Sequence, residues 1–552
     1  MKIVIVGGVA GGASAATRAR RMNEDAEIIL FEKDGYVSFA NCGLPYYIGG
    51  EIPKRESLLV ATPEFLRRRF KLDVRVRQEV LGIDRSSKTV TIRNHETNES
   101  YTETYDKLIL APGASPFVPP MDGANAENLF TLRNVEDTDR ITSYVDREQM
   151  KRAVVVGAGF IGLEMVEQLA HRGMTTTLVE LQPQVLPLLD REMAAPLEDE
   201  LREQGVQLHL GKSVAKVILN EESVGTAVEL SDGTVMPTDL VILGIGVRPN
   251  VKLAQEAGLE LGDSGGIATG DFMQTSDEDI YAVGDAAEYP YSPTSARMRV
   301  ALAGPANRAG RLAGQHAATG SSDPMQPVLG TSIVRVFDKT AAITGLSEGM
   351  AIRSEMDVKA VTIVAKDHAG YYPGAEAMTL KLLYAPETGK VLGAQVVGGV
   401  GCDKRIDVIA TAMHFGAGVR DLSGLDLAYA PPFGAAKDPV HLAAFVACNE
   451  LDGIESYCPA GASLDGYQVV DVRTPAEVAK TPIGGAEGSI NIPVDELRER
   501  LSELDDSKPT VVSCAVGIRG HIAARILKQS GFDVRNLVGG ATVRNRAWRP
   551  KN

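Results

Sequence analysis

The sequence predicts an α/β protein of several domains, and three observations support this prediction. An apolar strand, a Gly-rich turn and a helical segment follow one another at residues 2–32 and again at residues 153–180. Units of this βαβ kind build parallel sheets. A third strand, loop and helix pattern surrounds Cys514 near the end of the chain. The 552 residues suffice for about three to four domains of roughly 150 residues.

The composition is that of an ordinary globular protein, with 44% hydrophobic and 23% charged residues. The formal net charge of -15 opposes sequence-independent binding to nucleic acid or anionic lipid, so neither is an expected partner. Its five cysteines are few, odd in number and widely spaced, which predicts neither a disulfide framework nor a metal site. No signal-like segment and no long apolar run is found, so we expect a soluble protein of the reducing cytoplasm.

Both Gly-rich turns have the features of a dinucleotide site in a Rossmann-like domain. The strand at residues 2–6 leads to GGVAGG and the next strand ends at Glu32; the strand at 153–156 leads to GAGFIG and the next ends at Glu180. Glycines permit the tight turn, the helix N-terminus offers N–H groups to a pyrophosphate, and the acid accepts from a ribose hydroxyl. Val9 replaces the middle glycine of the first turn. The expected cofactor-binding residues are Gly7, Gly8, Gly11, Gly12, Glu32, Gly157, Gly159, Gly162 and Glu180.

A third signal is the segment YAVGDA, a strand that ends in the acid Asp285 before a helix. Together with Glu32 and the APG stretch at residues 111–113, it resembles the pyridine nucleotide-disulfide oxidoreductase family over residues 1–446. The resemblance implies FAD on the first Gly-rich turn, with Asp285 holding its ribitol, and a nicotinamide nucleotide on the second. It also implies a homodimer formed through an α+β dimerisation domain. The elements expected there are strands at 332–337, 378–384 and 391–397 and a helix at 405–415.

The last part of the chain reads as a small α/β domain. Its expected elements are a strand at 468–472, a helix at 494–504, a strand at 510–513, the loop CAVGIRG and a helix at 522–530. This order, with DVR at residues 471–473, resembles the rhodanese family. Backbone N–H groups of the loop can converge on the sulfur of Cys514, and Arg519 adds positive charge there. The six residues CAVGIR form a loop of a length that suits sulfur transfer, whereas a longer loop would admit phosphate.

Cys42 lies in the segment SFANCGLP, where many flavin disulfide reductases carry two cysteines in a CxxxxC pair. This chain has no second cysteine before Cys402. A single thiol cannot close an intramolecular disulfide, so its oxidised form must be a mixed disulfide, a persulfide or a sulfenic acid. NCGL looks like a helix start, a setting that favours the thiolate. The remaining cysteines, Cys402, Cys448 and Cys458, are expected to be structural.

The single Cys42 and the rhodanese tail together resemble coenzyme A-disulfide reductases with a C-terminal rhodanese, also called NADH-dependent persulfide reductases. The resemblance extends from end to end of the chain. It implies that phosphates of coenzyme A contact one helix face and that its thiol arm is guided to Cys42. The implied substrate-binding residues are Ser14, Arg18, Arg21, Ser38, Asn41, Asn307 and Lys437, with Arg519 at the second sulfur site.

Two tyrosines complete the site of this family across the dimer interface. Tyr429 matches one of them, and both Tyr371 and Tyr372 fit the other. Because neighbouring residues of an extended chain point to opposite faces, only one of the two can serve, and we choose Tyr371. A tyrosine hydroxyl can donate to a leaving thiolate and so stabilise its charge.

We therefore predict an enzyme that uses FAD and NADH to reduce coenzyme A disulfide, coenzyme A persulfide or polysulfide at Cys42. Cys514 would load sulfane sulfur and pass it on. Glu180 favours NADH over NADPH because its carboxylate would repel a 2'-phosphate. One alternative is an NADH oxidase or peroxidase that cycles Cys42 through sulfenic acid, although such enzymes typically have a His where this chain has Ala10. Another is a redox- or sulfur-sensing binding protein.

The motifs divide the chain into four predicted domains. The predicted segments are an FAD-binding domain at 1–112 and 248–322, an NAD(P)-binding domain at 113–247, a dimerisation domain at 323–446, a linker at 447–463 and a rhodanese domain at 464–552.

Overall fold

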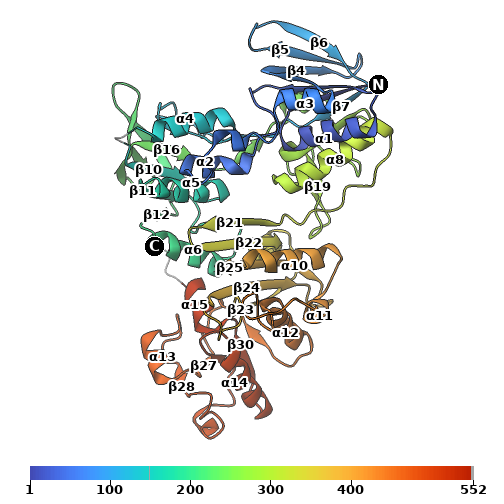
Figure 1. Cartoon of the computed structure of the whole chain (residues 1–552). Helices are drawn as coiled ribbons and strands as arrows, with labels where there is room; N and C mark the ends of the chain where they lie inside the picture. Colours follow the sequence, from blue (N-terminus) through green and yellow to red (C-terminus); the bar gives the residue numbers. More distant parts are fainter. Residues whose placement is uncertain (148–149, 549–552) are drawn as a thin grey trace. The chain divides into compact units, whose positions relative to one another are not determined.

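The computed structural model describes residues 1–147 and 150–548, and Figure 1 shows its helices and strands. The chain falls into two compact units, one of Met1–Val179 with Lys212–Gly330 and the other of Glu180–Gly211 with Thr331–Asn552. Parts of the predicted NAD(P)-binding and rhodanese domains, 148–149 and 549–552, lie outside the described residues. The four domain boundaries stay predictions.

The first unit contains a parallel sheet in the order β18, β7, β1, β2, β3. The middle strand, β1, is completely buried at Ile3, Val4 and Ile5, as expected for a parallel sheet covered on both faces. Two helices rich in small residues, α1 and α8, pack side by side next to it (Figure 1). The bounds are β1 (Lys2–Val6), β2 (Glu27–Glu32), β3 (Asp73–Val76), β7 (Lys107–Leu110), β18 (Ile280–Ala282), α1 (Ala10–Met22), α3 (Pro63–Phe70) and α8 (Ala303–Thr319).

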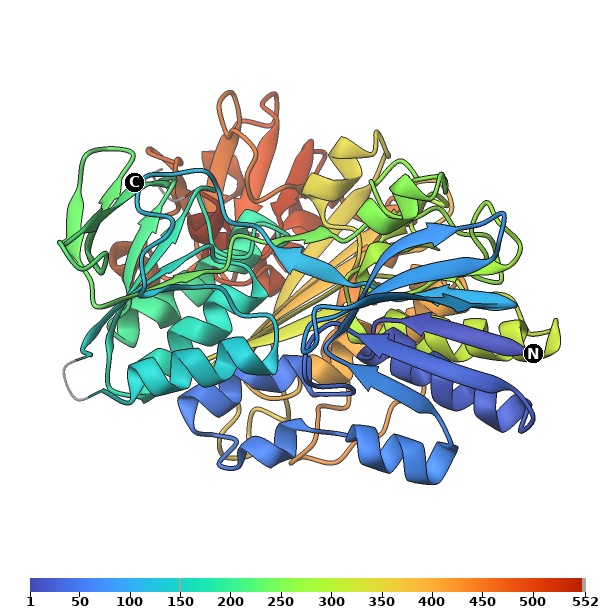
Figure 2. The same cartoon turned by 90° about the horizontal axis from the view of Figure 1, so that it is seen from above.

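The close packing of α1 on α8 depends on glycine. A Cβ on Gly310 would lie 2.1 Å from the carbonyl oxygen of Gly11, and one on Gly314 would lie 2.3 Å from that of Ala15. The unit also contains an antiparallel sheet in the order β4, β5, β6, drawn in blue in Figure 2, in which β4 contacts β2 of the parallel sheet. Its strands are β4 (Gln78–Asp84), β5 (Thr89–Asn94) and β6 (Ser100–Thr104).

A second parallel sheet of this unit runs in the order β11, β10, β16, β9, and residues Ala153–Val156 pair with the strands on both sides. Helix α5 follows β10, and the short helix α2 packs on α5 and on α4. The bounds are β9 (Leu129–Phe130), β10 (Arg152–Val156), β11 (Thr175–Glu180), β16 (Leu240–Leu243), α2 (Leu44–Gly49), α4 (Val135–Val145), α5 (Phe160–His171), and the antiparallel strands β13 (Val214–Leu219), β14 (Gly225–Leu230) and β15 (Val235–Pro237).

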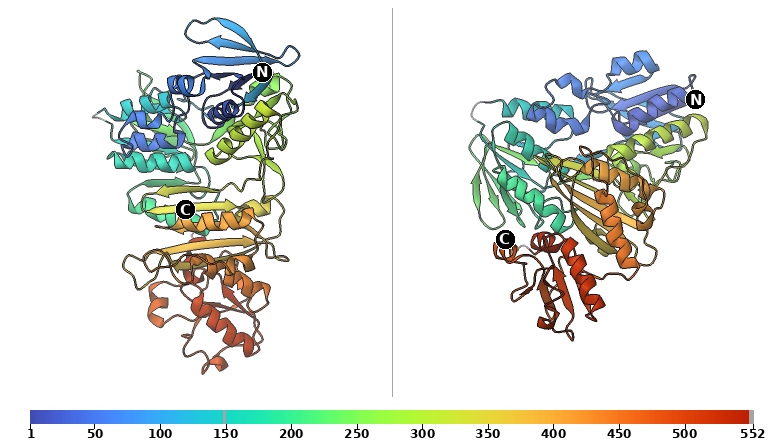
Figure 3. Two further views of the ribbon diagram at one scale, coloured as in Figure 1. Left: turned by 45° about the vertical axis from the view of Figure 1, so that its right-hand side comes forward. Right: turned by 60° about the horizontal axis from the view of Figure 1, so that its bottom comes forward.

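The second unit contains an antiparallel sheet in the order β21, β22, β25, β24, β23, whose yellow to orange strands are clear in Figure 3. Helix α10 packs on β22 and β25, α12 on β23 and β24, and α6 on β21, β22 and β25. The bounds are β21 (Ser332–Val336), β22 (Lys339–Gly345), β23 (Lys359–Lys366), β24 (Ala377–Tyr384), β25 (Val391–Gly398), α6 (Arg191–Glu203), α9 (Glu348–Arg353), α10 (Cys402–His414), α11 (Val419–Ser423) and α12 (Pro439–Leu451).

The remaining part of this unit is an all-parallel sheet in the order β26, β30, β29, β27, β28. Helix α14 packs on β29 and β30, and α15 packs on β30. The bounds are β26 (Tyr457–Cys458), β27 (Gln468–Asp471), β28 (Ile490–Asn491), β29 (Thr510–Ser513), β30 (Val534–Leu537), α13 (Pro475–Lys480), α14 (Ile518–Gln529) and α15 (Gly540–Ala547).

One predicted element of this sheet region is wrong. Residues 494–504 form consecutive turns and a short 3-10 helix, Leu501–Glu503, in place of an α-helix. Val494, Leu497 and Leu504 are buried, so the apolar spacing that suggested a helix serves the core of a tightly turning chain. The predicted linker at 447–463 is only partly irregular, because it includes the end of α12 and the strand β26. Among the described residues, no helix is both long and apolar enough to cross a membrane.

Candidate active site

The first Gly-rich turn brings the start of α1 close to the end of β1. Gly7 has a φ of +97°, and a Cβ on Gly12 would lie 1.8 Å from its carbonyl oxygen, so neither position tolerates a side chain. The buried carboxylate of Glu32 accepts from the backbone N–H of Gly8 at 2.7 Å and of Asp34 at 3.0 Å. Burial raises the pKa of Glu32, and these two N–H groups oppose that rise.

A cavity of about 660 Å³ opens at this turn, a volume that accommodates a large cofactor. Its lining includes Gly7, Glu32, Asn41, Gly113, Arg133 and Asn250. A turn without room for a Cβ, an acid at the end of the second strand and a cavity of this size fit a dinucleotide. The residues that would hold FAD are therefore Gly7, Gly8, Gly11, Gly12 and Glu32.

Asp285, the other predicted FAD ligand, lies in a 3-10 helix, Gly284–Ala286, and not directly before a long helix as predicted. Its Oδ2 lies 3.1 Å from Nη2 of Arg133, and Arg133 also lines the cavity. The amide of Asn41 donates to the carbonyl oxygen of Arg133 at 2.8 Å and accepts from its guanidinium at 3.1 Å. Arg133 therefore joins two predicted site residues that are far apart in the sequence.

Cys42 is exposed and is the middle residue of the 3-10 helix Asn41–Gly43, which runs directly into α2. Cys42 therefore lies at a helix start, as the sequence predicted, but most of the charges around its thiol oppose the thiolate. Although Cys42 is exposed, neighbouring protein atoms partly desolvate its sulfur; this desolvation first, and then the carboxylates of Glu164 and Asp285, raise the pKa of the thiol, while Arg133 lowers it. Ser38, four residues earlier, has a φ of +47° and donates its backbone N–H to the carbonyl oxygen of Gly8 at 2.8 Å.

The second Gly-rich turn repeats the geometry of the first. Gly157 has a φ of +99°, and a Cβ on Gly162 would lie 1.8 Å from its carbonyl oxygen. Gly159 is different, because a Cβ there would meet no atom within 4 Å. Its missing side chain leaves open space at the N-terminus of α5, where a pyrophosphate would bind. Glu180 is buried at the end of β11 and accepts from the backbone N–H of Gln182 at 2.7 Å.

Four of the residues predicted for substrate binding belong to the pair α1 and α8. The hydroxyl of Ser14 donates to Oδ1 of Asn307 at 2.6 Å, so the packing of the two helices brings these residues together. Arg18 donates from Nε to Oε1 of Gln315 at 3.2 Å. Burial and the neighbouring charges of Arg311 and Arg21 lower the pKa of Arg18. Positive charge is therefore concentrated on this face.

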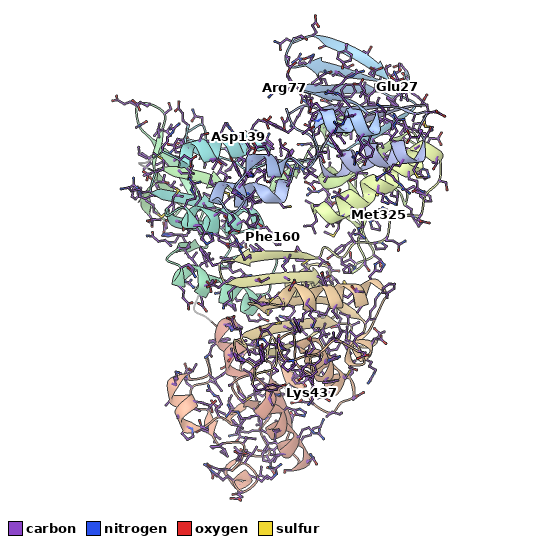
Figure 4. The ribbon with its side chains drawn as sticks, in the orientation of Figure 1. Glu27, Arg77, Asp139, Phe160, Met325 and Lys437 are labelled. Atoms are coloured by element: carbon purple, nitrogen blue, oxygen red, sulfur yellow. The ribbon has the colours of Figure 1, made fainter. Side chains whose placement is uncertain are left out.

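Tyr371 and Tyr429 lie in two different loops of the second unit, and their hydroxyl oxygens are 3.0 Å apart. Their side chains are 77% and 48% exposed. Tyr372 instead packs edge-on against the ring of His368. Lys437 is exposed in the loop before α12. Figure 4 labels its position in the second unit.

Cys514 is buried directly after the carboxyl end of β29, and the backbone N–H of Gly517 donates to its sulfur at 3.1 Å. Gly517 has a φ of +101° and precedes α14, so the sulfur lies near the N-terminus of that helix. Arg519 forms a two-point ion pair with Glu477 of α13. Its positive charge is therefore already matched by a carboxylate.

The three other cysteines have no comparable surroundings. Cys402 and Cys458 are buried and Cys448 is half-buried. Burial raises the pKa of Cys402 to about 12, which keeps that thiol protonated and unreactive at neutral pH.

Sequence reasoning missed Arg133 and Glu477. Arg133 belongs to no motif, and only the fold brings it to Cys42. Glu477 did have a local signal, because Thr474 and Glu477 form a capping box at the start of α13. That spacing predicts a helix start, but not that the same carboxylate reaches Arg519.

Comparison with protein families gives three matches along the chain. The family described as pyridine nucleotide-disulphide oxidoreductase matches residues 1–310, and its dimerisation domain matches residues 331–439. The chain belongs to the pyridine nucleotide-disulphide oxidoreductase family. A rhodanese-like domain matches residues 460–543.

Membership of the pyridine nucleotide-disulphide oxidoreductase family makes this chain a flavin-dependent oxidoreductase that uses FAD and a nicotinamide nucleotide. The predicted fold class is confirmed: two Rossmann-like domains, an α+β dimerisation domain and a C-terminal rhodanese-like α/β domain.

Three relatives are similar over most of the chain. A coenzyme A disulfide reductase of Staphylococcus epidermidis is 36% identical over 446 residues, which are 81% of this chain and 99% of that protein. The structure of reduced Bacillus anthracis CoADR-RHD is 46% identical with a TM-score of 0.94, covering 99% of this chain and 98% of that one. An NAD-dependent persulfide reductase from A. fulgidus is 38% identical with a TM-score of 0.91, covering 98% of this chain and 100% of that one.

Proposed function

We propose that this enzyme uses NADH to reduce coenzyme A disulfide, coenzyme A persulfide or polysulfide at Cys42. The observation that carries the proposal is a single exposed thiol near a cofactor-sized cavity, in a chain with no second cysteine before Cys402. Such a thiol must exchange with a sulfur atom of the substrate. Relatives that match nearly the whole chain are a CoADR-RHD and a persulfide reductase, which favours sulfur chemistry over the oxidase and sensing alternatives.

The first chemical step is thiol exchange at Cys42. The Cys42 thiolate attacks one sulfur of the substrate, a new S–S bond to Cys42 forms, the substrate S–S bond breaks, and a thiolate or hydrosulfide leaves. Two electrons and a proton then convert the mixed disulfide on Cys42 into the Cys42 thiolate and a free thiol. Bound FAD supplies the route by which electrons from the nicotinamide nucleotide reach this sulfur.

The cationic face of α1 and α8 suits the phosphates of coenzyme A. Arg18 has two arginine neighbours, Arg21 and Arg311, and its own hydrogen bonds go to the neutral amide of Gln315. An anion bound there would relieve the repulsion among the three guanidinium groups. Ser14 and Asn307 add neutral hydrogen-bonding groups on the same face. Ser38 and Asn41, which lie next to Cys42 in the sequence, would guide the thiol arm.

The tyrosine pair would act on the leaving group. Each hydroxyl can donate to a thiolate, and a donor aimed at developing negative charge lowers the barrier to its departure. We assign this role to Tyr371 and Tyr429 in a homodimer, with Lys437 near the phosphates. Their mutual hydrogen bond supports the choice of Tyr371 over Tyr372.

Cys514 would form the persulfide of the rhodanese-like domain. Its sulfur already accepts the N–H of Gly517 and lies at a helix N-terminus, both of which stabilise negative charge on sulfur. We assign it the loading of sulfane sulfur, which a thiol carrier passes on to Cys42. For the nucleotide, Glu180 would accept from the ribose hydroxyls and repel a 2'-phosphate, which favours NADH. We further propose that the enzyme works in the reducing cytoplasm, where Cys42 is kept as a thiol.

The test compares single cysteine variants of the flavin-loaded enzyme. Cys42→Ser should abolish NADH-linked reduction of coenzyme A disulfide and of coenzyme A persulfide. Cys448→Ser, which removes another accessible thiol, should retain both activities. Full NADH-linked reduction in Cys42→Ser would show that the proposal is wrong, and faster turnover with oxygen or peroxide than with any sulfur substrate would favour the oxidase alternative.

A further inference from the structure

The loops that carry the tyrosine pair lie outside the packed core. Residues 367–376 join β23 to β24 and carry Tyr371, and residues 424–438 join α11 to α12 and carry Tyr429. Both side chains are substantially exposed, so packing alone does not hold their hydroxyl groups together. A hydrogen bond between two exposed side chains persists only where the backbones that carry them are held in place.

One buried side chain connects the two loops. Arg405 of α10 is 2% exposed, and its Nη2 donates to the carbonyl oxygen of Asp367 at 2.6 Å and to Oδ2 of Asp438 at 2.8 Å. Its Nε lies 3.3 Å from Oδ1 of Asp438, and its Nη1 donates to the carbonyl oxygen of Gly401 at 3.2 Å. Asp367 begins the first loop and Asp438 ends the second. A single guanidinium group therefore holds the base of both.

The two anchors transmit this constraint into their loops. Oδ1 of Asp367 accepts the backbone N–H of His368 and of Glu376, both at 2.9 Å, and so closes the first loop at its base. Asp438 caps α12 by accepting the N–H of Val440 at 3.0 Å. Farther along, the N–H of Ala369 donates to the carbonyl oxygen of Gly434 at 2.9 Å, which joins one loop to the other.

The chemistry of Arg405 favours placement of the loops over simple stabilisation. A buried ion pair is weak support for stability, because an apolar side chain of similar size often serves as well. An apolar residue or a lysine cannot satisfy acceptors on two separate loops and at the start of its own helix at fixed angles, as a planar guanidinium does.

We propose that Arg405 is a positioning residue that sets the distance between the hydroxyl groups of Tyr371 and Tyr429. This inference rests on the proposed function in one respect only: the tyrosine pair is taken to donate to the leaving thiolate. Arg405 itself touches neither the reacting sulfur nor a cofactor.

The first test measures the tyrosine pair directly in the flavin-loaded enzyme. The hydrogen bond that Tyr371 donates to Tyr429 raises the pKa of Tyr371, so Tyr371 should ionise at lower pH when the pair comes apart. Tyrosinate absorbance is measured against pH for each enzyme and for the same enzyme carrying Tyr371→Phe. The difference between the two curves gives the titration midpoint of Tyr371. Arg405→Lys should lower this midpoint, whereas Asp407→Asn, a charge change at an exposed position of the same helix, should not. An unchanged midpoint in Arg405→Lys would overturn the proposal.

The second test is kinetic. Arg405→Lys should reduce kcat with coenzyme A disulfide by up to about 100-fold, because removing one such donor altogether costs about 100- to 1000-fold, and the KM for NADH should be unchanged. In the double variant Arg405→Lys with Tyr371→Phe, the loss of kcat should be no greater than for Tyr371→Phe alone, because the two substitutions disrupt the same interaction. Losses that multiply would indicate a general structural role and contradict positioning through the tyrosines.

Two further outcomes distinguish the positioning role of Arg405 from the proposed role of the tyrosine pair. Where Arg405→Lys does not fold, Asp438→Asn keeps the cap of α12 but removes the charged partner of Arg405, and it should show the same pattern more weakly. If Arg405→Lys lowers the Tyr371 midpoint while Tyr371→Phe turns over at the wild-type rate, the positioning role stands and the proposed use of the tyrosines is wrong.

Discussion

The carboxylate of Glu477 holds the guanidinium of Arg519 at two points, with N–O distances of 2.9 Å and 2.6 Å. The ion pair with Arg519 lowers the pKa of Glu477 to about 2, so the carboxylate stays charged at neutral pH. The pKa of Arg519 is raised, first by Glu477 and more weakly by the nearby Cys514. Arg519 therefore presents less positive charge to an anionic sulfur donor than its place in the loop suggests.

Replacing Glu477 should favour anionic donors at Cys514. Glu477→Gln keeps the capping geometry with Thr474 but frees the charge of Arg519. We expect sulfur transfer from thiosulfate to cyanide to rise by up to about fivefold, since a partly exposed ion pair is worth about 1 kcal/mol or less. Glu487→Gln, which removes an exposed charge from the same domain, is the matched control. An equal change in both variants would contradict a specific effect on Arg519.

The pH dependence of Cys42 should follow the charges around it. Burial, Glu164 and Asp285 raise the pKa of the thiol, and only the thiolate reacts, so its alkylation rate should increase with pH through that raised value. Glu164→Gln removes a negative charge and should shift the midpoint to lower pH. Arg133→Gln removes the opposing positive charge and should shift it to higher pH. Iodoacetamide labelling of the reduced enzyme measures both; midpoints that coincide would show that these groups do not act on Cys42.

The two glycines of the second turn should respond differently to one methyl group. In Gly162→Ala the new Cβ would lie 1.8 Å from a carbonyl oxygen, so the thermal midpoint should fall. In Gly159→Ala the Cβ would meet no protein atom, so the thermal midpoint should be unchanged while the KM for NADH increases by about tenfold or more. Calorimetry and steady-state kinetics separate the two effects. An unaffected KM in Gly159→Ala would place the nucleotide elsewhere.

An ion pair between the rhodanese-like domain and the segment just before it should make the stability of that domain depend on pH. The hydrogen bond to the buried carboxylate of Glu455 raises the pKa of His521 above its usual value. A raised folded-state pKa means that the stabilisation is complete below about pH 6.5, the unfolded value, and is lost as pH rises through the folded value.

The only tryptophan of the chain, Trp548, lies in this domain and reports its unfolding by fluorescence. The thermal midpoint of the wild type should exceed that of His521→Gln below about pH 6.5, and the two should converge at higher pH. Glu455→Gln should lose the same pH dependence. A constant difference between wild type and His521→Gln across this range would show that the pair does not contribute through its charge.

Sequence patterns predicted most of the fold because their signals are local. Each Gly-rich turn, its flanking strand and its acid lie within about 30 residues, the span of one βαβ unit. The failure at residues 494–504 is also local in origin. Apolar residues at helical spacing there pack into the core from consecutive turns, and periodicity cannot distinguish the two arrangements.

The candidate site also has a part that local motifs predict and a part that they do not. Cys42, Cys514 and the glycines could be chosen from motifs, but their electrostatic surroundings could not. Arg133 and Glu164 are far from Cys42 in the sequence, yet they act in opposite directions on its thiol. Glu477 is 42 positions from Arg519 and pairs with it.

The sequence by itself determined which chemical groups this protein has: two Gly-rich turns, one cysteine after the first of them and one at the start of a rhodanese-like loop. Tertiary structure alone decided how those groups are charged and held. The reason is physical: hydrogen bonds and ion pairs depend on distances of a few ångströms between side chains. Arg405, which meets Asp367 and Asp438 from a third element, obtains its partners only when the loops fold against α10.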